Sequence, residues 1–195
     1  MKKSKSLFLI LGAIVLLAVW GASINNNLVT LEEGIKGQWA NVESSYQRRA
    51  DLIPNIVNTA KGYAEFEQET LTQVVEARSN ASSVKIDPTN ITPEELAQFE
   101  QAQSGVSSAL SRLLVTVERY PELKANENFS ELINELERTE NRINVERNRF
   151  NERVQSFNSK VRRFPTNVMA GILGFAQQGY FKSDEGASVA PTVEF

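Results

Sequence analysis

Carboxylates are the side chains of this 195-residue chain that could carry out acid–base chemistry or bind a metal. The sequence holds 24 Asp and Glu residues but no His and no Cys. It therefore lacks the commonest general base, the commonest zinc ligand and any thiol. Thiol catalysis, disulfides and a serine triad of the usual form are excluded, which leaves only carboxylate acid–base or metal chemistry.

Charged residues of both signs lie on or beside the apolar stripes of predicted helices. They are Arg49, Arg78 and Arg147 against Glu67, Glu118 and Glu140. Carboxylates on facing helices can hold two iron ions, but such bundles also use Glu-x-x-His motifs, and the arginines would repel a metal. Because an unpaired buried ion is costly, we interpret these six residues, with Asp51, as a structural ion network that sets helix register. We predict no catalytic residue, metal or cofactor.

Apolar residues recur at steps of three and four from Leu28 to Ile53, and a second such stripe runs from Ile53 to Arg78. This spacing is typical of helices. Pro54 lies between the stripes, and a proline inside a helix costs about 3 kcal/mol. We therefore predict a helix break at residues 51–54. The alternative is a kink in one long helix, because the apolar residues before and after Pro54 fall on nearly the same helix face.

Two further helices follow a polar loop at residues 80–90. The tetrapeptide Thr-Pro-Glu-Glu at 92–95 has the pattern of a capping box, and the stripe after it ends at Pro121. Asn126 can cap the last helix, which Pro165 ends. That helix carries a heptad repeat, expected to be core: Phe129, Leu136, Ile143, Phe150, Phe157 and Phe164.

Asn151 and Asn158 lie one heptad apart at the edge of this apolar face, where we expect interhelical hydrogen bonds. No segment alternates as a strand would. The sequence therefore predicts an all-α fold, in which an N-terminal transmembrane helix is followed by an antiparallel four-segment bundle of long helices.

The N-terminal segment has the pattern of a membrane anchor. Lysines at positions 2, 3 and 5 precede an apolar run from Leu7 to Ile24, which as a helix is roughly 27 Å long and close to the thickness of a bilayer core. Trp20 suits the interface at its far end. The alternative is a cleaved signal peptide with a weak site around Val19 and Gly21, but there is no A-x-A and the run is long.

The charges on either side of the anchor predict its orientation. The lysines come before it, and Glu32 and Glu33 come after it. Positive residues favour the cytoplasmic side, so we expect a cytoplasmic N-terminus and a bundle outside the cytoplasm. The net charge of −3 becomes more negative without those lysines, which argues against nucleic acid as a partner.

We divide the chain into a basic tip and anchor (1–27), a helical bundle (28–165), and an apolar segment with a flexible tail (166–195). The last part contains a run of nine apolar or Gly residues, from Val168 to Ala176, which is too short to span a membrane. It could cap the bundle, lie at the membrane surface or contact a partner or another subunit. Its candidate contact residues are Val168, Met169, Ile172, Leu173, Phe175, Phe181 and Phe195.

Several motifs resemble the LemA family of bacterial membrane proteins. They are Arg-Arg-Ala-Asp-Leu-Ile-Pro-Asn at 48–55, Lys-Gly-Tyr-Ala at 61–64, Glu-Arg-Tyr-Pro-Glu-Leu-Lys at 118–124 and Phe-Pro at 164–165. The resemblance covers nearly the whole chain. It implies a protein of the bacterial inner membrane that has a single membrane anchor and a helical bundle, and it implies no established activity. Phe150 and Phe157 stand where the family often has Tyr.

Three classes of function remain open. The first is a membrane-tethered scaffold or adaptor that binds partner proteins or itself as a homo-oligomer. The second is a membrane-organising or envelope-stress protein that acts on lipid directly. The third, a carboxylate-based hydrolase, needs a cleft with an exposed Glu of raised pKa, and such regular helical stripes leave little room for one. We therefore expect a non-enzymatic protein, with lipid bound through the N-terminal helix.

Overall fold

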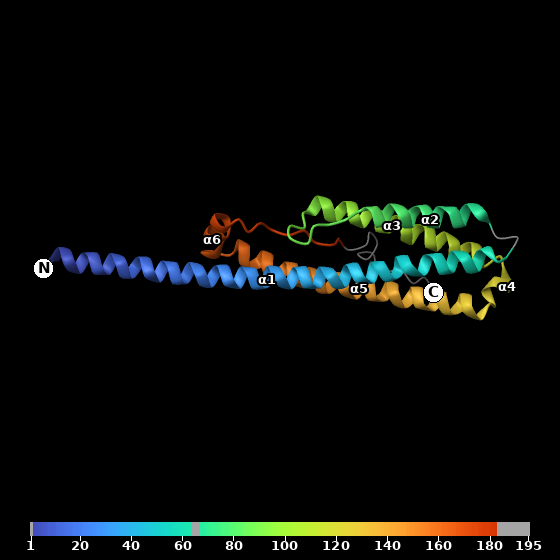
Figure 1. Cartoon of the computed structure of the whole chain (residues 1–195), viewed down its shortest axis with the longest axis horizontal. Coiled ribbons are helices and arrows are strands. Elements are labelled where there is room, and N and C mark those ends of the chain that lie inside the picture. The colour runs from blue at the N-terminus through green and yellow to red at the C-terminus, as the bar shows by residue number, and fades with distance from the viewer. Residues whose placement is uncertain (1, 64–66, 183–195) are drawn as a thin grey trace, which may run out of the picture.

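The structure is a computed structural model that describes residues 2–63 and 67–182, with side chains from Ile10 onward. All six elements in this part of the chain are helices. The longest, α1 (Lys2–Lys61), extends past the other helices at its N-terminal end (Figure 1). The remaining helices are gathered along its C-terminal two-thirds, so the molecule is a rod with a single-helix extension.

Helix α1 continues through Pro54, so the predicted break at 51–54 is wrong and the alternative of one long helix is right. A proline at position 54 has no N–H to donate to the carbonyl of Ala50. That carbonyl instead accepts a hydrogen bond from Nε of Arg78, at 2.6 Å. A side chain from the next helix thus replaces the backbone donor that the proline lacks.

The chain reverses after Lys61 rather than at Pro54. Helix α2 (Gln68–Ser83) runs back along the bundle, and α3 (Pro93–Val117) returns beside it. The predicted capping box is confirmed, because the Thr92 side chain accepts from the Glu95 N–H while the Glu95 carboxylate accepts from the Thr92 N–H. The one-turn helix α4 (Pro121–Lys124) makes the next reversal.

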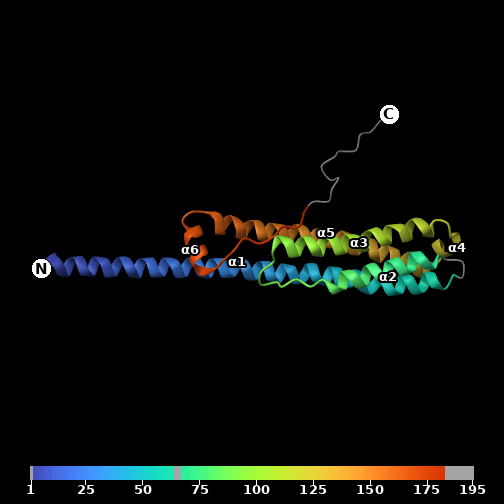
Figure 2. The same cartoon turned by 90° about the horizontal axis from the view of Figure 1, so that it is seen from above.

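Helix α5 (Glu127–Arg162) packs along α1 for most of its length and is the main partner of that helix. Its predicted cap is confirmed, since Oδ1 of Asn126 accepts from the N–H of Phe129 at 2.9 Å. The short helix α6 (Thr166–Leu173) follows and contacts both α1 and α5. Figure 1 shows α1–α5 and α2–α3 as two layers, and Figure 2 shows α6 at the end of the bundle nearer the N-terminus.

The buried residues form two clusters along the rod. One lies toward the α4 end and is aliphatic apart from Phe129, with Leu71, Leu113 and Leu136 among its members. The other lies nearer the N-terminus and combines aliphatic residues with six aromatic ones, and we call it the aromatic core. In this cluster the Trp39 ring meets Phe99 at 5.3 Å and Phe150 at 5.6 Å between ring centroids.

The heptad of α5 is buried from Phe129 to Phe157, as predicted for its first five members. The sixth, Phe164, is 78% exposed, so its assignment to the core is wrong. Helix α5 ends at Arg162, and the backbone therefore no longer carries the heptad position to the buried side.

Candidate functional site: a polar groove between α3 and α5

A polar cavity of about 340 Å³ opens between α3 and α5, with α1 as its floor. Its volume lies in the usual range of ligand pockets, about 300–1,000 Å³. The residues that line it and that bear on its chemistry are Arg49, Glu100, Gln103, Glu140, Asn144 and Arg147. Because α3 and α5 belong to different layers, their facing sides are left free to form this groove.

Arg49 holds the floor of the cavity and is only 2% exposed. Its Nη1 donates to Oε1 of Glu140 and to Oγ of Ser107, at 2.8 and 2.9 Å. Its Nη2 donates to Oε1 of Gln103 at 2.6 Å. One guanidinium therefore joins α1, α3 and α5, and its charge is matched by the Glu140 carboxylate.

A second ion pair lies at the edge of the cavity nearer α6. Nη2 of Arg147 donates to Oε1 of Glu100 at 2.8 Å and to the carbonyl of Lys182 at 2.9 Å. The same Arg147 guanidinium lies 4.9 Å from the ring centroid of Phe181. The two arginines and two carboxylates give the groove little net charge.

Tyr46 packs beneath these charges, with the Arg49 guanidinium 5.1 Å from its ring centroid. Burial raises the pKa of the Tyr46 phenol, while the positive charges of Arg147 and Arg49 act in the opposite direction. The neutral phenol is therefore the form that the folded protein favours.

Residues 175–182, which we call the strap, extend along α5 from α6 to the groove (Figure 1). Two asparagines of α5 hold the strap by its backbone. The Asn158 side chain accepts from the N–H of Gln178 and donates to its carbonyl, both at 2.9 Å. Asn151 does the same for Phe181, at 2.9 and 3.0 Å. The two predicted asparagines thus bond to an extended segment rather than to another helix.

The spacing of these bonds follows from geometry. Seven residues of α-helix rise about 10.5 Å, and three residues of extended chain cover about 10 Å. Asparagines one heptad apart on α5 can therefore bond to every third residue of an extended segment. Asn158 bonds to Gln178 and Asn151 bonds to Phe181 in this way. Asn144 lies one heptad further on and lines the cavity. The groove therefore continues the surface on which the strap is held.

The predicted charged residues lie in several places. Arg49 and Glu140 are brought together. Glu67 pairs with Arg119 at 2.8 Å, and Glu118 pairs with Lys124 at 2.6 Å, both on the surface near the α4 end. Asp51 accepts from Gln47 on its own helix. Arg78 bonds to a backbone carbonyl, and Arg147 pairs with Glu100.

Sequence reasoning missed Glu100, Gln103 and Asn144. Glu100 and Gln103 lie at the edge of the α3 stripe, and only the heptad series 144, 151, 158 on α5 could have pointed to Asn144. Among residues 2–63 and 67–182 no group of three or more Asp and Glu side chains is placed to hold a metal.

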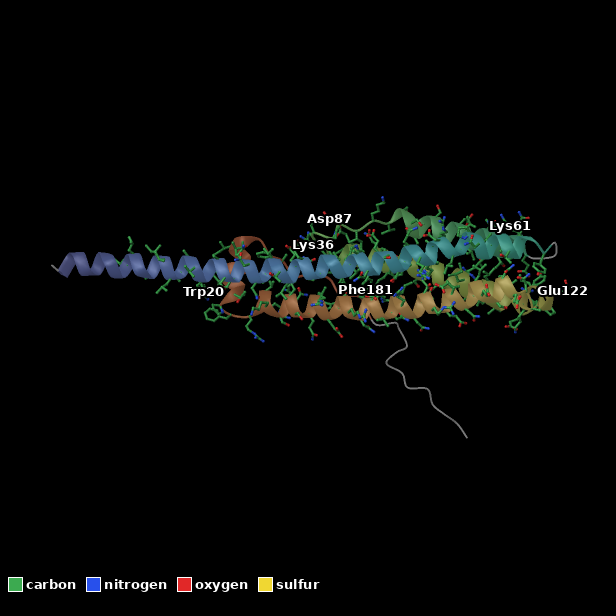
Figure 3. All side chains as sticks on the ribbon, turned by 60° about the horizontal axis from the view of Figure 1, so that its bottom comes forward. Trp20, Lys36, Lys61, Asp87, Glu122 and Phe181 are labelled. Carbon is green, nitrogen blue, oxygen red and sulfur yellow. The ribbon has the colours of Figure 1, made fainter. Side chains whose placement is uncertain are left out.

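The candidate contact residues near the C-terminus divide into two groups. Phe181 is 4% exposed and stacks on Trp39 in the aromatic core, and Phe175 packs against Phe157. Figure 3 shows Phe181 at the middle of the rod, between α1 and α5. The candidate contact residues on α6 lie on the surface, except Met169, which is half-buried against α1. Phe195 lies outside the described residues.

From Ile10 onward, helix α1 is long and apolar enough to cross a membrane, and its apolar stretch is almost wholly exposed. These features define a class, a membrane-associated helical bundle carried on a single apolar helix. The LemA family model matches residues 38–195, and the chain belongs to the LemA family.

Curated relatives agree with this assignment. The chain is 25% identical over 174 residues to magnetosome protein MamQ 2 of Paramagnetospirillum magneticum, covering 80% of this chain and 64% of that protein. It is 28% identical over 118 residues to protein LemA of Metamycoplasma hominis, covering 60% and 50%. Magnetosome protein MamQ of Magnetospirillum gryphiswaldense is 25% identical, covering 80% and 64%. The chain thus spans about two-thirds or less of the length of these relatives.

Proposed function

We propose that this protein is a membrane-tethered, non-enzymatic adaptor that holds an extended segment of a partner protein in the groove between α3 and α5. The observation that carries the proposal is the strap. The same face of α5 already binds extended backbone through Asn151 and Asn158. Asn144, in register with both, lines the adjoining cavity and offers the same amide to a partner.

The chemistry of the groove describes the partner segment. Backbone bonds from an asparagine place no demand on the side chains of the bound segment, so they supply affinity without strict sequence preference. Arg147 and Glu100 flank the entry with opposite charges, and Arg49 and Glu140 are paired within. A polar segment of low net charge suits these walls better than an apolar or strongly charged one.

The long helix α1 supports tethering. It runs unbroken from the apolar segment to the far end of the bundle, so the groove is held at a set height above the bilayer. In this proposal α1 crosses the bacterial inner membrane once, with a cytoplasmic N-terminus and the bundle outside the cytoplasm. Homo-oligomers arise if the bound segment comes from a second copy.

Site-specific photocrosslinking in cells tests the adaptor. A photoreactive residue replaces the groove residue Ser104, and the control replaces Val115, which lies on the same helix outside the groove and is 71% exposed. We expect a defined protein adduct from position 104 only, identified by mass spectrometry. Asn144→Leu should remove that adduct, whereas Asn134→Leu on the exposed side of α5 should leave it.

Equal adducts from both positions, or none from position 104, would refute the adaptor proposal. The second candidate function, direct action on lipid, is favoured by the exposed apolar residues of α6. In that case the purified protein would remodel liposomes without any partner, and Asn144→Leu would leave this activity unchanged.

A further inference from the structure

The end of the bundle nearest the apolar half of α1 carries a cluster of exposed apolar side chains. Phe164 is 78% exposed, Ile172 73%, Val168 54% and Leu173 41%. Helix α6 contains no charged residue, and the only one of its residues that is fully buried against the bundle is Ala170. Of its large side chains, Val168, Ile172 and Leu173 therefore point away from the protein, which is costly if they face water.

Helix α6 is docked directly on the apolar part of α1. Gly21 is buried, and a Cβ at that position would lie 3.2 Å from Cε of Met169. Contacts with both α1 and α5 hold α6 in place. Figure 3 shows Trp20 of α1 at the level of α6. The exposed apolar surface of α1 therefore continues without interruption onto α6.

The depth of this contact matches an interfacial position. The apolar run of α1 ends at Ile24 and is followed by Asn25, Asn26 and Asn27. Gly21 lies three residues before Ile24, or about 4.5 Å at about 1.5 Å per residue. Helices in the membrane interface sink about 5–10 Å into it. If the bilayer boundary falls at the asparagines, α6 lies at that depth.

Basic residues border the cluster. Lys160 and Arg162 lie in the last turn of α5, Arg163 follows as its C-cap, and all three are exposed, directly before Phe164. Cationic side chains beside an apolar surface favour a bilayer with anionic headgroups. We infer that α6 and Phe164 form an interfacial lipid-binding surface, which lies in the headgroup region beside α1 and fixes the bundle against an anionic bilayer. This inference does not depend on the adaptor proposal.

Depth-dependent fluorescence of the full chain in vesicles tests this surface. The chain has no native Cys, so single cysteines can be labelled cleanly. An environment-sensitive fluorophore is attached at Ile172→Cys, with Val115→Cys as the matched control, because their exposures of 73% and 71% are nearly equal. Val15→Cys, in the apolar half of α1, reports whether the anchor is inserted. The vesicles contain phosphatidylglycerol and phosphatidylethanolamine, with bromine at shallow or deep acyl positions.

We expect several-fold stronger quenching at position 172 than at 115 with shallow bromines, together with protection from aqueous iodide. Position 15 should respond most to deep bromines. Replacing Arg162 and Arg163 with Gln should weaken the quenching at position 172 and leave it unchanged at position 15.

Iodide access at 172 equal to that at 115 would overturn the inference. So would protection from iodide without quenching by lipid, which would show that another copy of the chain covers α6. Absence of quenching at position 15 would overturn it as well, because α6 would then have no membrane beside it. None of these outcomes changes the crosslinking expected at Ser104, so the adaptor proposal is tested separately.

Discussion

Arg78 should stabilise the bundle only because residue 54 is a proline. Its Nε bonds to the carbonyl of Ala50, the group that Pro54 leaves without a donor. A hydrogen bond to a charged group contributes about 1.5–3 kcal/mol. Arg78 is half-buried rather than buried, so we expect Arg78→Met to lower the free energy of unfolding by about 2 kcal/mol. For a chain of this size that corresponds to a fall in Tm of about 4–8 °C.

The dependence on Pro54 is measured with a double-mutant cycle. In the Pro54→Ala background the new N–H bonds to the Ala50 carbonyl, so Arg78→Met should then cost less than about 0.5 kcal/mol. Pro54→Ala alone should be stabilising, since an interior proline is unfavourable by about 3 kcal/mol. Chemical unfolding of the full chain in detergent is followed by the emission of buried Trp39, with Trp20→Phe present throughout.

Arg142→Met, at an exposed position of α5, is the control for loss of an arginine and should change stability by no more than about 0.5 kcal/mol. An equal cost of Arg78→Met in the two backgrounds would refute the reasoning. Arg78 would then act through its charge or its packing rather than through the orphaned carbonyl.

Three further predictions follow from the groove and the strap. Glu140→Leu leaves buried Arg49 without its countercharge and should lower the free energy of chemical unfolding by about 3 kcal/mol. This is the lower end for a broken buried pair, because Glu140 is partly exposed. Adding Arg49→Met should restore most of the lost stability, and no recovery would contradict this account. Gly179→Ala should release the strap to proteolysis, because a Cβ there would lie 3.0 Å from the backbone at the start of α3, whereas Gly171→Ala has open space and should not. Because the pKa of Tyr46 is raised in the folded state, its contribution to the free energy of unfolding should be fully present below about pH 10 and be lost as pH rises above it. Denaturation curves measured across this pH range should show a smaller loss of stability for Tyr46→Phe. An unchanged pH dependence would refute the raised pKa of Tyr46 as its cause.

The local signals were sufficient for most helix boundaries. The capping box at Thr92 and the cap at Asn126 are made by residues within four positions of one another, so their sequence pattern carries the whole interaction. The heptad of α5 likewise follows from helical periodicity as far as Phe157. Phe164 departs from it because the helix ends two residues earlier, after Arg162.

Long-range partners could not be read from the pattern. The spacing of charged residues identified Arg49 and Glu140 as lying on inward faces, but did not indicate that Gln103 and Ser107 of α3 complete the same site. Phe181 was predicted to contact a membrane or a partner. The strap instead places it in the aromatic core, through bonds with Asn151 thirty residues away.

By itself, the sequence determined that this chain is all-α, that an apolar segment precedes an amphipathic bundle, and that it resembles the LemA family. Periodicity, caps and hydropathy are properties of neighbouring residues, so no tertiary information was needed. Only the tertiary structure decided that α1 continues through Pro54, since the compensating donor comes from a residue 28 positions from Ala50. It also decided that the strap closes onto α5 and leaves a groove at its end, because those hydrogen bonds exist only once distant segments are packed together.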